Sequence, residues 1–169
     1  MAETKAKDAV ALLKEDHRTV EELFAQFEKA SGDGRKQKLA TEICTELSIH
    51  AQIEEEIFYP ACEGKVEEEL LKEAYVEHDG AKVLIAEIIG GEPSDEFYDA
   101  KVKVLQEQIE HHVEEEEKMR GNIFQQARAT DVDLEALGER MAARKAELKQ
   151  MAETQGLPPA ETKTLTEAH

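Results

Sequence analysis

Helix-breaking and cross-linking residues are scarce in this sequence. Its 169 residues include only 9 glycines, 4 prolines and 2 cysteines, and tryptophan is absent. Glycine and proline are the least favourable residues inside helices, whereas the abundant alanine, glutamate, lysine and leucine are among the most favourable. The composition therefore predicts an all-α protein, and the length predicts one globular domain.

Long apolar segments and paired cysteines are also missing. The most apolar run, VLIAEII at residues 83–89, is far shorter than the roughly 20 residues that cross a bilayer. No apolar stretch follows a basic segment near the start, so no signal peptide is predicted and we expect a cytoplasmic protein. Cys44 and Cys62 form no CxxC motif, which disfavours a disulfide framework, and we interpret both as packing residues.

Positive charge is in short supply. The chain has 21 basic and 39 acidic side chains, which gives a formal net charge of −18 at pH 7. Such a charge repels phosphate backbones and anionic lipids, so neither nucleic acid nor a membrane surface is an expected partner. Carboxylates also attract cations, but most such charge lies on solvated helix faces, so the charge alone does not identify a function.

Turn-forming residues gather at four points that predict the helix boundaries. These points are residues 31–34, 62–65, 90–95 and 129–133. They predict an up-down four-helix bundle over residues 8–128 and an additional C-terminal helix over 129–153, which packs on the bundle or on a partner. The polar stretch 154–169 contains two prolines and is expected to be disordered.

Apolar residues recur at alternating steps of three and four in each segment, which keeps their side chains on one helix face. Each of these four stripes contains one histidine, at His17, His50, His78 and His112. In the second and fourth stripes a glutamate follows four residues later, at Glu54 and Glu116. The fourth stripe is expected to continue through Met119 to Ile123 in one helix.

The histidines and glutamates form an internal repeat. Positions 17, 50 and 54 recur as 78, 112 and 116, at an offset of 61 or 62 residues. The domain is therefore expected to consist of two similar antiparallel hairpins. Counting from the turns places the histidines at one height, except for a mismatch of roughly 10 Å between His78 and His112 at 1.5 Å per helical residue. Non-helical structure within residues 90–97 would remove that mismatch.

Four imidazoles and two carboxylates inside an apolar bundle need partners, because an isolated buried carboxylate costs several kcal/mol. A His-x3-Glu pair places two ligands one turn apart on one face, where both can reach a shared ion. Six nitrogen and oxygen ligands exceed what one tetrahedral zinc takes and suit two five- or six-coordinate ions with an open position. Iron is the first choice and manganese the second, while a metal-free His/Glu hydrogen-bond network is the alternative.

Four motifs, EDH, HAQIEEEIFYP, EHD and HHVEEEE, resemble the hemerythrin-like His-His-Glu cation-binding domain over roughly residues 8–128. The resemblance implies an up-down four-helix bundle with two Fe ions and a bridging oxo or hydroxo group, Mn or Zn being possible. It implies that Glu54 and Glu116 bridge the metals. The implied ligands are His17, His50, Glu54, His78, His112 and Glu116.

Two features depart from the family pattern, and the first leaves a ligand missing or supplied elsewhere. The animal oxygen carriers have a second histidine one turn along the third helix, where this chain has Ala74 and Lys82. The second motif is also ambiguous, because His111 could pair with Glu115 or Glu116, although the apolar stripe selects His112 with Glu116. His111 itself is open to three interpretations: a fifth ligand, an outer partner or a plain surface residue. Tyr75 is either a hydroxyl that faces the site or a core aromatic. The IFYP segment after the first motif is not repeated after the second.

The resemblance favours a di-iron protein that binds or senses oxygen, nitric oxide or peroxide, rather than an enzyme. The open metal position is expected to face an apolar wall formed by Val20, Phe24, Ile57, Ile85 or Met119. The alternatives are a peroxide-consuming or iron-handling enzyme, including a relative of the iron–sulfur repair proteins, and a metal-free structural bundle. Those repair proteins usually have a further cysteine-containing N-terminal region, which weakens that alternative.

Overall fold

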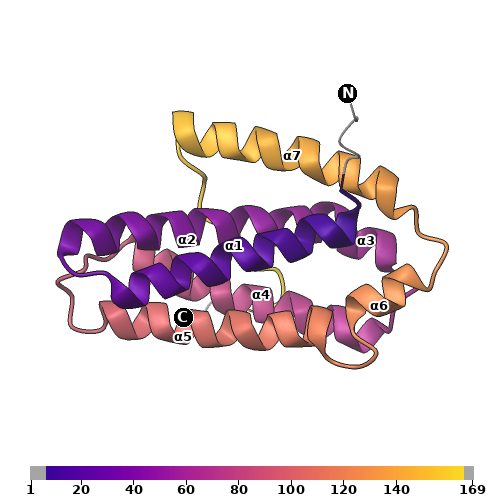
Figure 1. Ribbon diagram of the computed structural model, residues 1–169, viewed down its shortest axis with the longest axis horizontal. Coiled ribbons are helices and arrows are strands. Elements are labelled where there is room, and N and C mark those ends of the chain that lie inside the picture. Colours follow the sequence, from indigo (N-terminus) through magenta and orange to yellow (C-terminus); the bar gives the residue numbers. More distant parts are fainter. Residues whose placement is uncertain (1–6, 166–169) are drawn as a thin grey trace.

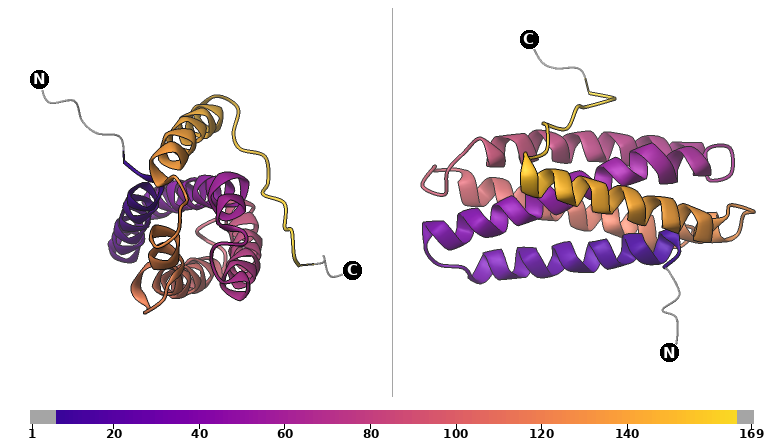
Figure 2. Two further views of the ribbon diagram at one scale, coloured as in Figure 1. Left: turned by 90° about the vertical axis from the view of Figure 1, so that its right-hand side faces the viewer. Right: turned by 90° about the horizontal axis from the view of Figure 1, so that it is seen from above.

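The computed structural model describes residues 7–165, and every regular element within them is helical. Four long helices run up and down and occupy the corners of a bundle when viewed end-on (Figures 1 and 2). They are α1 (Ala9–Lys29), α2 (Asp33–Ile53), α4 (Glu68–Ile89) and α5 (Tyr98–Val113). The all-α class and the four-helix bundle are thus confirmed. No helix among these residues is long and apolar enough to cross a membrane.

Shorter elements continue two of the long helices. A π-helical turn, η1 (Glu54–Phe58), and the short helix α3 (Tyr59–Cys62) extend α2. A second π-helical turn, η2 (Glu114–Lys118), extends α5 and is followed by α6 (Ile123–Arg128). The two π turns occupy equivalent positions in the repeat and contain the glutamates of both predicted motifs. Such turns are frequent at functional sites.

The helix boundaries follow local capping chemistry. Asp8 accepts a hydrogen bond of 2.8 Å from the backbone N–H of Ala11 and so caps α1. Asn122 and Asp133 cap α6 and α7 (Leu134–Thr154) in the same way. All of residues 90–97 lie between α4 and α5, outside both helices. The ring centroids of His78 and His112 lie 4.8 Å apart, so the height mismatch that the sequence left between these two histidines is absent.

The apolar core forms two clusters with a polar layer between them. One cluster contains Leu13, Ile53 and Phe124, and the other contains Val20 and Leu105. The four stripe histidines and both glutamates lie between these clusters, so apolar packing shields the layer on both sides.

The predicted continuous helix through Met119 is wrong. Met119 has extended backbone angles (φ −71°, ψ 151°) and a side chain that is 53% exposed. The chain turns at Gly121, which has φ 73°, and Asn122 then caps a new helix that buries Ile123. Helical periodicity alone gave no sign of this break, because Gly121 and Asn122 act through turn and cap geometry.

The C-terminal helix α7 packs across α1 and α2, outside the four-helix bundle (Figures 1 and 2). Its buried residues include Leu137, Met141 and Leu148. Gly138 permits the close approach, because a Cβ at this position would collide with the backbone of residues 7 and 8. Beyond α7, residues 155–165, where the sequence predicts disorder, have no helix or strand but hydrogen-bond to α4. The rest of that predicted tail, 166–169, lies outside the described residues.

Candidate metal centre

One histidine from each long helix reaches the centre of the bundle. His17 comes from α1, His50 from α2, His78 from α4 and His112 from α5, and all four are buried. Glu54 and Glu116, from the two π turns, are also buried, with no exposed surface. The structure therefore brings the six residues singled out in the sequence into one layer.

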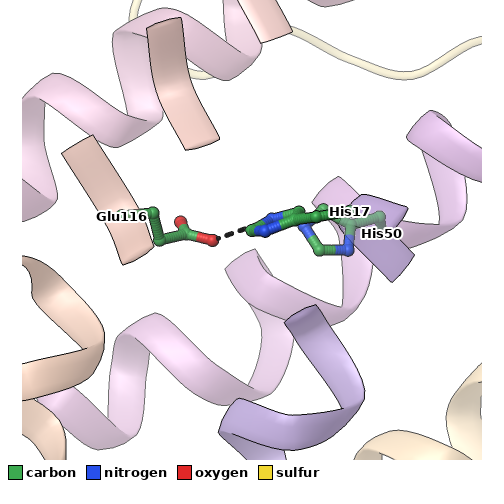
Figure 3. Close-up of side chains that lie close together, drawn as sticks. All are labelled: His17, His50 and Glu116. Carbon is green, nitrogen blue, oxygen red and sulfur yellow. Dashed lines mark ion pairs between the residues drawn. The ribbon is translucent and has the colours of Figure 1, made fainter. Parts of the chain in front are cut away.

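The six residues form two clusters of three. His17, His50 and Glu116 make one cluster, and Figure 3 shows the carboxylate of Glu116 pointing toward the two rings. Glu54, His78 and His112 make the other. Within each cluster the candidate ligand atoms lie within 4.8 Å of one another, which is the spacing that a shared ion requires.

Each glutamate lies between two pairs of histidines, His17 with His50 and His78 with His112. Glu54 Oε1 is 2.9 Å from His50 Nε2 and 3.3 Å from His78 Nε2. Glu116 Oε1 is 3.3 Å from His17 Nε2, and its Oε2 is 3.1 Å from His112 Nε2. Both carboxylates thus contact both halves of the site, as a bridging carboxylate must.

Several buried atoms of this layer have no hydrogen-bond partner within the described chain. They are the Nε2 atoms of His17 and His50, both carboxylate oxygens of Glu54 and Oε1 of Glu116. Native proteins rarely leave such groups unsatisfied, because each one loses its hydration without compensation. Imidazole nitrogens and carboxylate oxygens are ligands that iron, manganese and zinc all accept. The residues present therefore fit metal ions.

A second set of carboxylates holds the outer side of each imidazole. Every stripe histidine has Nδ1 within 3.0 Å of a carboxylate oxygen from a neighbouring helix or π turn. The pairs are His17 with Glu117, His50 with Asp16, His78 with Glu55, and His112 with Glu77. A carboxylate accepts the Nδ1 proton, which leaves the Nε2 lone pair directed inward for a metal.

Each outer carboxylate is the chain neighbour of an inner ligand, so the arrangement repeats in both hairpins. Asp16 and Glu77 directly precede a stripe histidine, and Glu55 and Glu117 directly follow an inner glutamate. Sequence reasoning missed these four residues, although the acidic residues directly beside His17, Glu54, His78 and Glu116 were the available signal.

Lysine and arginine side chains contact three of the four outer carboxylates. Lys145 of α7 pairs with Asp16, and Arg18 pairs with Glu117. Lys82 Nζ donates to Glu55 across 3.0 Å. These cations offset the cost of placing additional negative charge beside the buried layer.

The carboxylates raise the pKa of two inner histidines, His50 and His112, in the metal-free chain. Burial lowers the pKa of His50, but the charge of Glu54 and the hydrogen bond to Asp16 outweigh it and raise the pKa to about 10. Burial likewise lowers the pKa of His112, which Glu116 and Glu77 raise well above its usual value. Protons therefore occupy these imidazoles when no metal competes for them.

Tyr59 contributes a hydroxyl that the sequence interpretation did not place in the site. Its ring is fully buried, and its hydroxyl donates a 2.6 Å hydrogen bond to Glu116 Oε2. The hydroxyl oxygen also lies 3.4 Å from the Nε2 atoms of both His78 and His112. It therefore occupies the half of the site where the family pattern would place an additional histidine.

The π turn explains why helical counting missed Tyr59. The backbone N–H of Tyr59 bonds to the carbonyl of Glu54, five residues earlier, so this turn contains one residue more than an α-helical turn. Tyr59 is thereby brought to the face of the helix on which Glu54 lies. The unrepeated IFYP segment was the available signal, because the second hairpin leaves its helix at the equivalent point.

The two other candidate residues lie farther out. His111 is 65% exposed, and its Nε2 lies 3.0 Å from Glu115 and 3.5 Å from Glu77. It therefore contacts an outer carboxylate rather than the inner layer. Tyr75 packs edge-on against the ring of Tyr59, with the ring centroids 5.3 Å apart.

A small cavity adjoins the four histidines. It has a volume of about 30 Å³, and apolar residues form most of its remaining wall. These are Val20, Leu47, Ala51, Ala81, Ile85, Ile109 and Val113. Val20 and Ile85 line it as predicted, whereas Phe24, Ile57 and Met119 do not. Phe24 lines a different pocket, Ile57 packs in the cluster around Phe124, and Met119 faces solvent.

The chain is similar in sequence and structure to known proteins. The family model of the hemerythrin HHE cation-binding domain matches residues 8–121. A crystal structure from Mycobacterium kansasii, of a hemerythrin HHE cation-binding domain-containing protein described as an Rv2633c homolog, aligns with a TM-score of 0.73 and 26% identity. That alignment covers 89% of this chain and 95% of the other. A relative from Nostoc sp. (strain PCC 7120), named DNA nickase, is 28% identical over 106 residues, which are 63% of this chain but only 30% of that longer protein.

Proposed function

This chain belongs to the hemerythrin HHE cation-binding domain family, and from this premise we propose that it holds two iron ions and binds a small molecule such as oxygen, nitric oxide or peroxide beside them. The proposed metal ligands are the four stripe histidines together with Glu54 and Glu116 as bridges, with an oxo or hydroxo group between the ions. Manganese and zinc would accept the same donors.

One observation carries the proposal: the two clusters of candidate ligands and the apolar cavity share the same four histidines. Each three-residue cluster presents its donor atoms within 4.8 Å of one another. Five buried atoms, on His17, His50, Glu54 and Glu116, have no hydrogen-bond partner in the described chain. The cavity lies directly against all four rings. A ligand in this cavity would therefore contact the metal positions without displacing a protein side chain.

The residues of the chain prepare the site in two ways. The outer carboxylates keep each Nδ1 protonated and orient each imidazole, so the inward lone pairs are fixed in place. Tyr59 holds a proton at its hydroxyl oxygen and orients Glu116 by the bond that it donates. Bound iron supplies the redox and ligand-binding chemistry, which no side chain of the layer supplies by itself.

The size of the cavity supports a small ligand over an organic substrate. A cavity needs about 10–15 Å³ to hold one water molecule, and this one measures about 30 Å³. That volume admits a molecule of two or three heavy atoms. Most of the cavity wall is apolar, which suits a neutral diatomic because such a molecule is weakly hydrated and needs no hydrogen bonds from the wall.

Metal analysis and gas titration test this function together. Protein from iron-replete cells should contain close to two metal ions per chain, mainly iron, and the reduced form should change its visible spectrum with oxygen or nitric oxide. Val20→Ile, which adds a methylene group to the cavity wall, should weaken nitric oxide binding several-fold at unchanged metal content. Val102→Ile is the matched control, because Val102 is equally buried but does not line the cavity.

Two results would reject the proposal in different ways. A single zinc or no metal under these conditions would rule out the di-iron site. Two irons without a spectral response to either gas, together with sustained oxygen release from peroxide at substoichiometric protein, would replace ligand binding with the peroxide-consuming alternative.

A further inference from the structure

The end of the described chain returns to the bundle after α7. Residues 156–165, called the C-terminal strap here, begin at Gly156, where φ is 77°, and pass along the outside of α2 and α4 (Figure 2). Leu157 packs against the apolar core, and Pro158 and Pro159 restrict the backbone that follows. The strap lies beyond residue 121, where the family match ends.

The strap is anchored to one buried carboxylate beside the metal centre. Asp79, the neighbour of His78 on α4, has no exposed surface. It accepts hydrogen bonds of 2.5–3.0 Å from the backbone N–H groups of Lys163, Thr164 and Leu165. The Thr164 hydroxyl donates a further bond of 2.6 Å to it. A single acidic side chain of the bundle thus holds three consecutive residues of the strap.

Lys82 joins the strap to the outer carboxylate of the site. Its side chain is only 7% exposed, and its Nζ donates to Glu55 at 3.0 Å and to Asp79 at 3.4 Å. The same Nζ donates to the backbone carbonyl of Glu161 at 3.1 Å. Lys163 adds a contact of 3.3 Å to Glu55. The strap therefore contacts the carboxylate that orients His78.

The central cavity shares part of its wall with the space beneath the strap. A groove of about 430 Å³ lies between the strap and helices α2 and α4, and residues 156–160 form its outer side. Ser48, Lys82 and Ile85 line both this groove and the cavity at the histidines. These three side chains therefore form a wall that the two spaces share where α2 faces α4.

We propose that small molecules enter the metal centre between α2 and α4, past Ser48 and Lys82, and that the C-terminal strap covers this portal. The proposal rests on the function proposed above, because it concerns access to that same cavity. The strap opens more easily than the bundle unfolds, since only polar contacts and one apolar side chain hold it. Release of the strap exposes the portal while the four histidines stay on their helices.

Thiol labelling of metal-free protein tests the cover independently of the metal. Ser48→Cys places a reactive group at the portal, in a Cys44→Ala background because Cys44 also lines the groove. Iodoacetamide should modify Cys at position 48 at least tenfold faster in a chain that ends at Gln155 than in the full chain. A chain ending at Leu165 retains every anchor contact described above and is the control.

Asp79→Asn in the full-length chain gives the same test without a deletion, because the amide has no charge and its NH2 group replaces the oxygen that accepts from Lys82 Nζ and from the Lys163 N–H. It should also accelerate labelling at least tenfold. Equal labelling rates in the full, shortened and Asp79→Asn chains would overturn the strap as a cover. Helical content by circular dichroism verifies that each variant is folded.

Azide binding to ferric protein, followed by stopped-flow absorbance, tests the route itself. Loss of the strap should raise the association rate at least tenfold at unchanged iron content, and Ser48→Phe should lower it at least tenfold. Unchanged rates in both variants would overturn the portal. If the full chain binds no iron, the proposed function fails instead, and the labelling rates still report whether the strap covers Ser48.

Discussion

The Tyr59 hydroxyl donates a 2.6 Å hydrogen bond to Glu116, although the two residues belong to different hairpins of the repeat. Glu116 is the carboxylate that contacts His17 in one cluster and His112 in the other. One tyrosine therefore acts on a residue common to both proposed metal positions. Because the second hairpin has no equivalent tyrosine, the two halves of the site are chemically different.

Replacing Tyr59 with phenylalanine removes this hydroxyl while retaining the ring. We expect the metal content to stay near that of the original protein and the visible spectrum to change. In the metal-free form, loss of a donor to a buried carboxylate should lower the free energy of unfolding by about 1–3 kcal/mol. Tyr75→Phe is the control. A spectral change in Tyr75→Phe but not in Tyr59→Phe would show that the hydroxyl at the site belongs to Tyr75 and not to Tyr59.

Substitutions in α5 and η2 separate the candidate ligands of the second motif. His112→Ala and Glu116→Ala should lose most of the metal, because each removes an inner donor and leaves the remaining donors buried without their ion. His111→Ala should retain it, since His111 is largely exposed. The metal content of each purified variant shows whether His112 or His111 is the ligand. Loss of metal from His111→Ala but not from His112→Ala would overturn the assignment.

Asp16→Asn tests an outer carboxylate. The substitution retains the shape of the side chain but removes the charge that orients His50 through Nδ1. Changes of this kind typically reduce metal affinity roughly 10–100-fold, and competition with a chelator measures the effect. Glu15→Gln is the control, because Glu15 is exposed and pairs with Lys7 on the surface. Equal affinities in the two variants would show that Asp16 does not support the site.

The pH dependence of the metal-free protein follows from His50. Its folded pKa of about 10 lies above the unfolded value of about 6.5. Protonation therefore stabilises the fold fully below about pH 6.5, and this stabilisation is lost as the pH rises toward 10. The midpoint of thermal unfolding should fall across this range. A constant or rising midpoint would contradict the raised pKa.

Metal loading at neutral pH should release protons, because a metal and a proton compete for the same inner nitrogens. A pH indicator in weakly buffered solution detects this release. The metal-bound protein should not show the alkaline loss of stability, since the ion replaces the proton.

Phe124→Ala probes the apolar seal at the α6 end of the bundle. Phe124 is buried, stacks on His17 with centroids 5.9 Å apart, and packs edge-on against Phe58. Its truncation should cost about 3–5 kcal/mol in the free energy of unfolding, measured with denaturant. Phe97→Ala is the control, because Phe97 is exposed and surface changes usually stay within about 0.5 kcal/mol. A similar small cost at both positions would contradict the role of Phe124 in the core.

Periodicity along the chain, together with clusters of turn-forming residues, was sufficient to predict the bundle, three of its turns and the inward position of the six inner residues. Helical spacing is a local property, so a histidine at a three-or-four step from buried leucine and valine must lie on the inner face wherever the backbone stays α-helical. The internal repeat further predicted two similar hairpins, and counting from the turns predicted that their histidines lie at one height. The non-helical stretch between Ile89 and Tyr98 followed from that same count.

The remaining features depend on departures from α-helical geometry and on contacts between distant segments. The π turn after Ile53 rotates Tyr59 into the site, and the turn at Gly121 exposes Met119. The outer carboxylates, the cavity wall and the strap on Asp79 join residues that are 20 to 100 positions apart. No spacing rule encodes these pairings, because which side chains meet depends on how the helices rotate and pack once the core is closed.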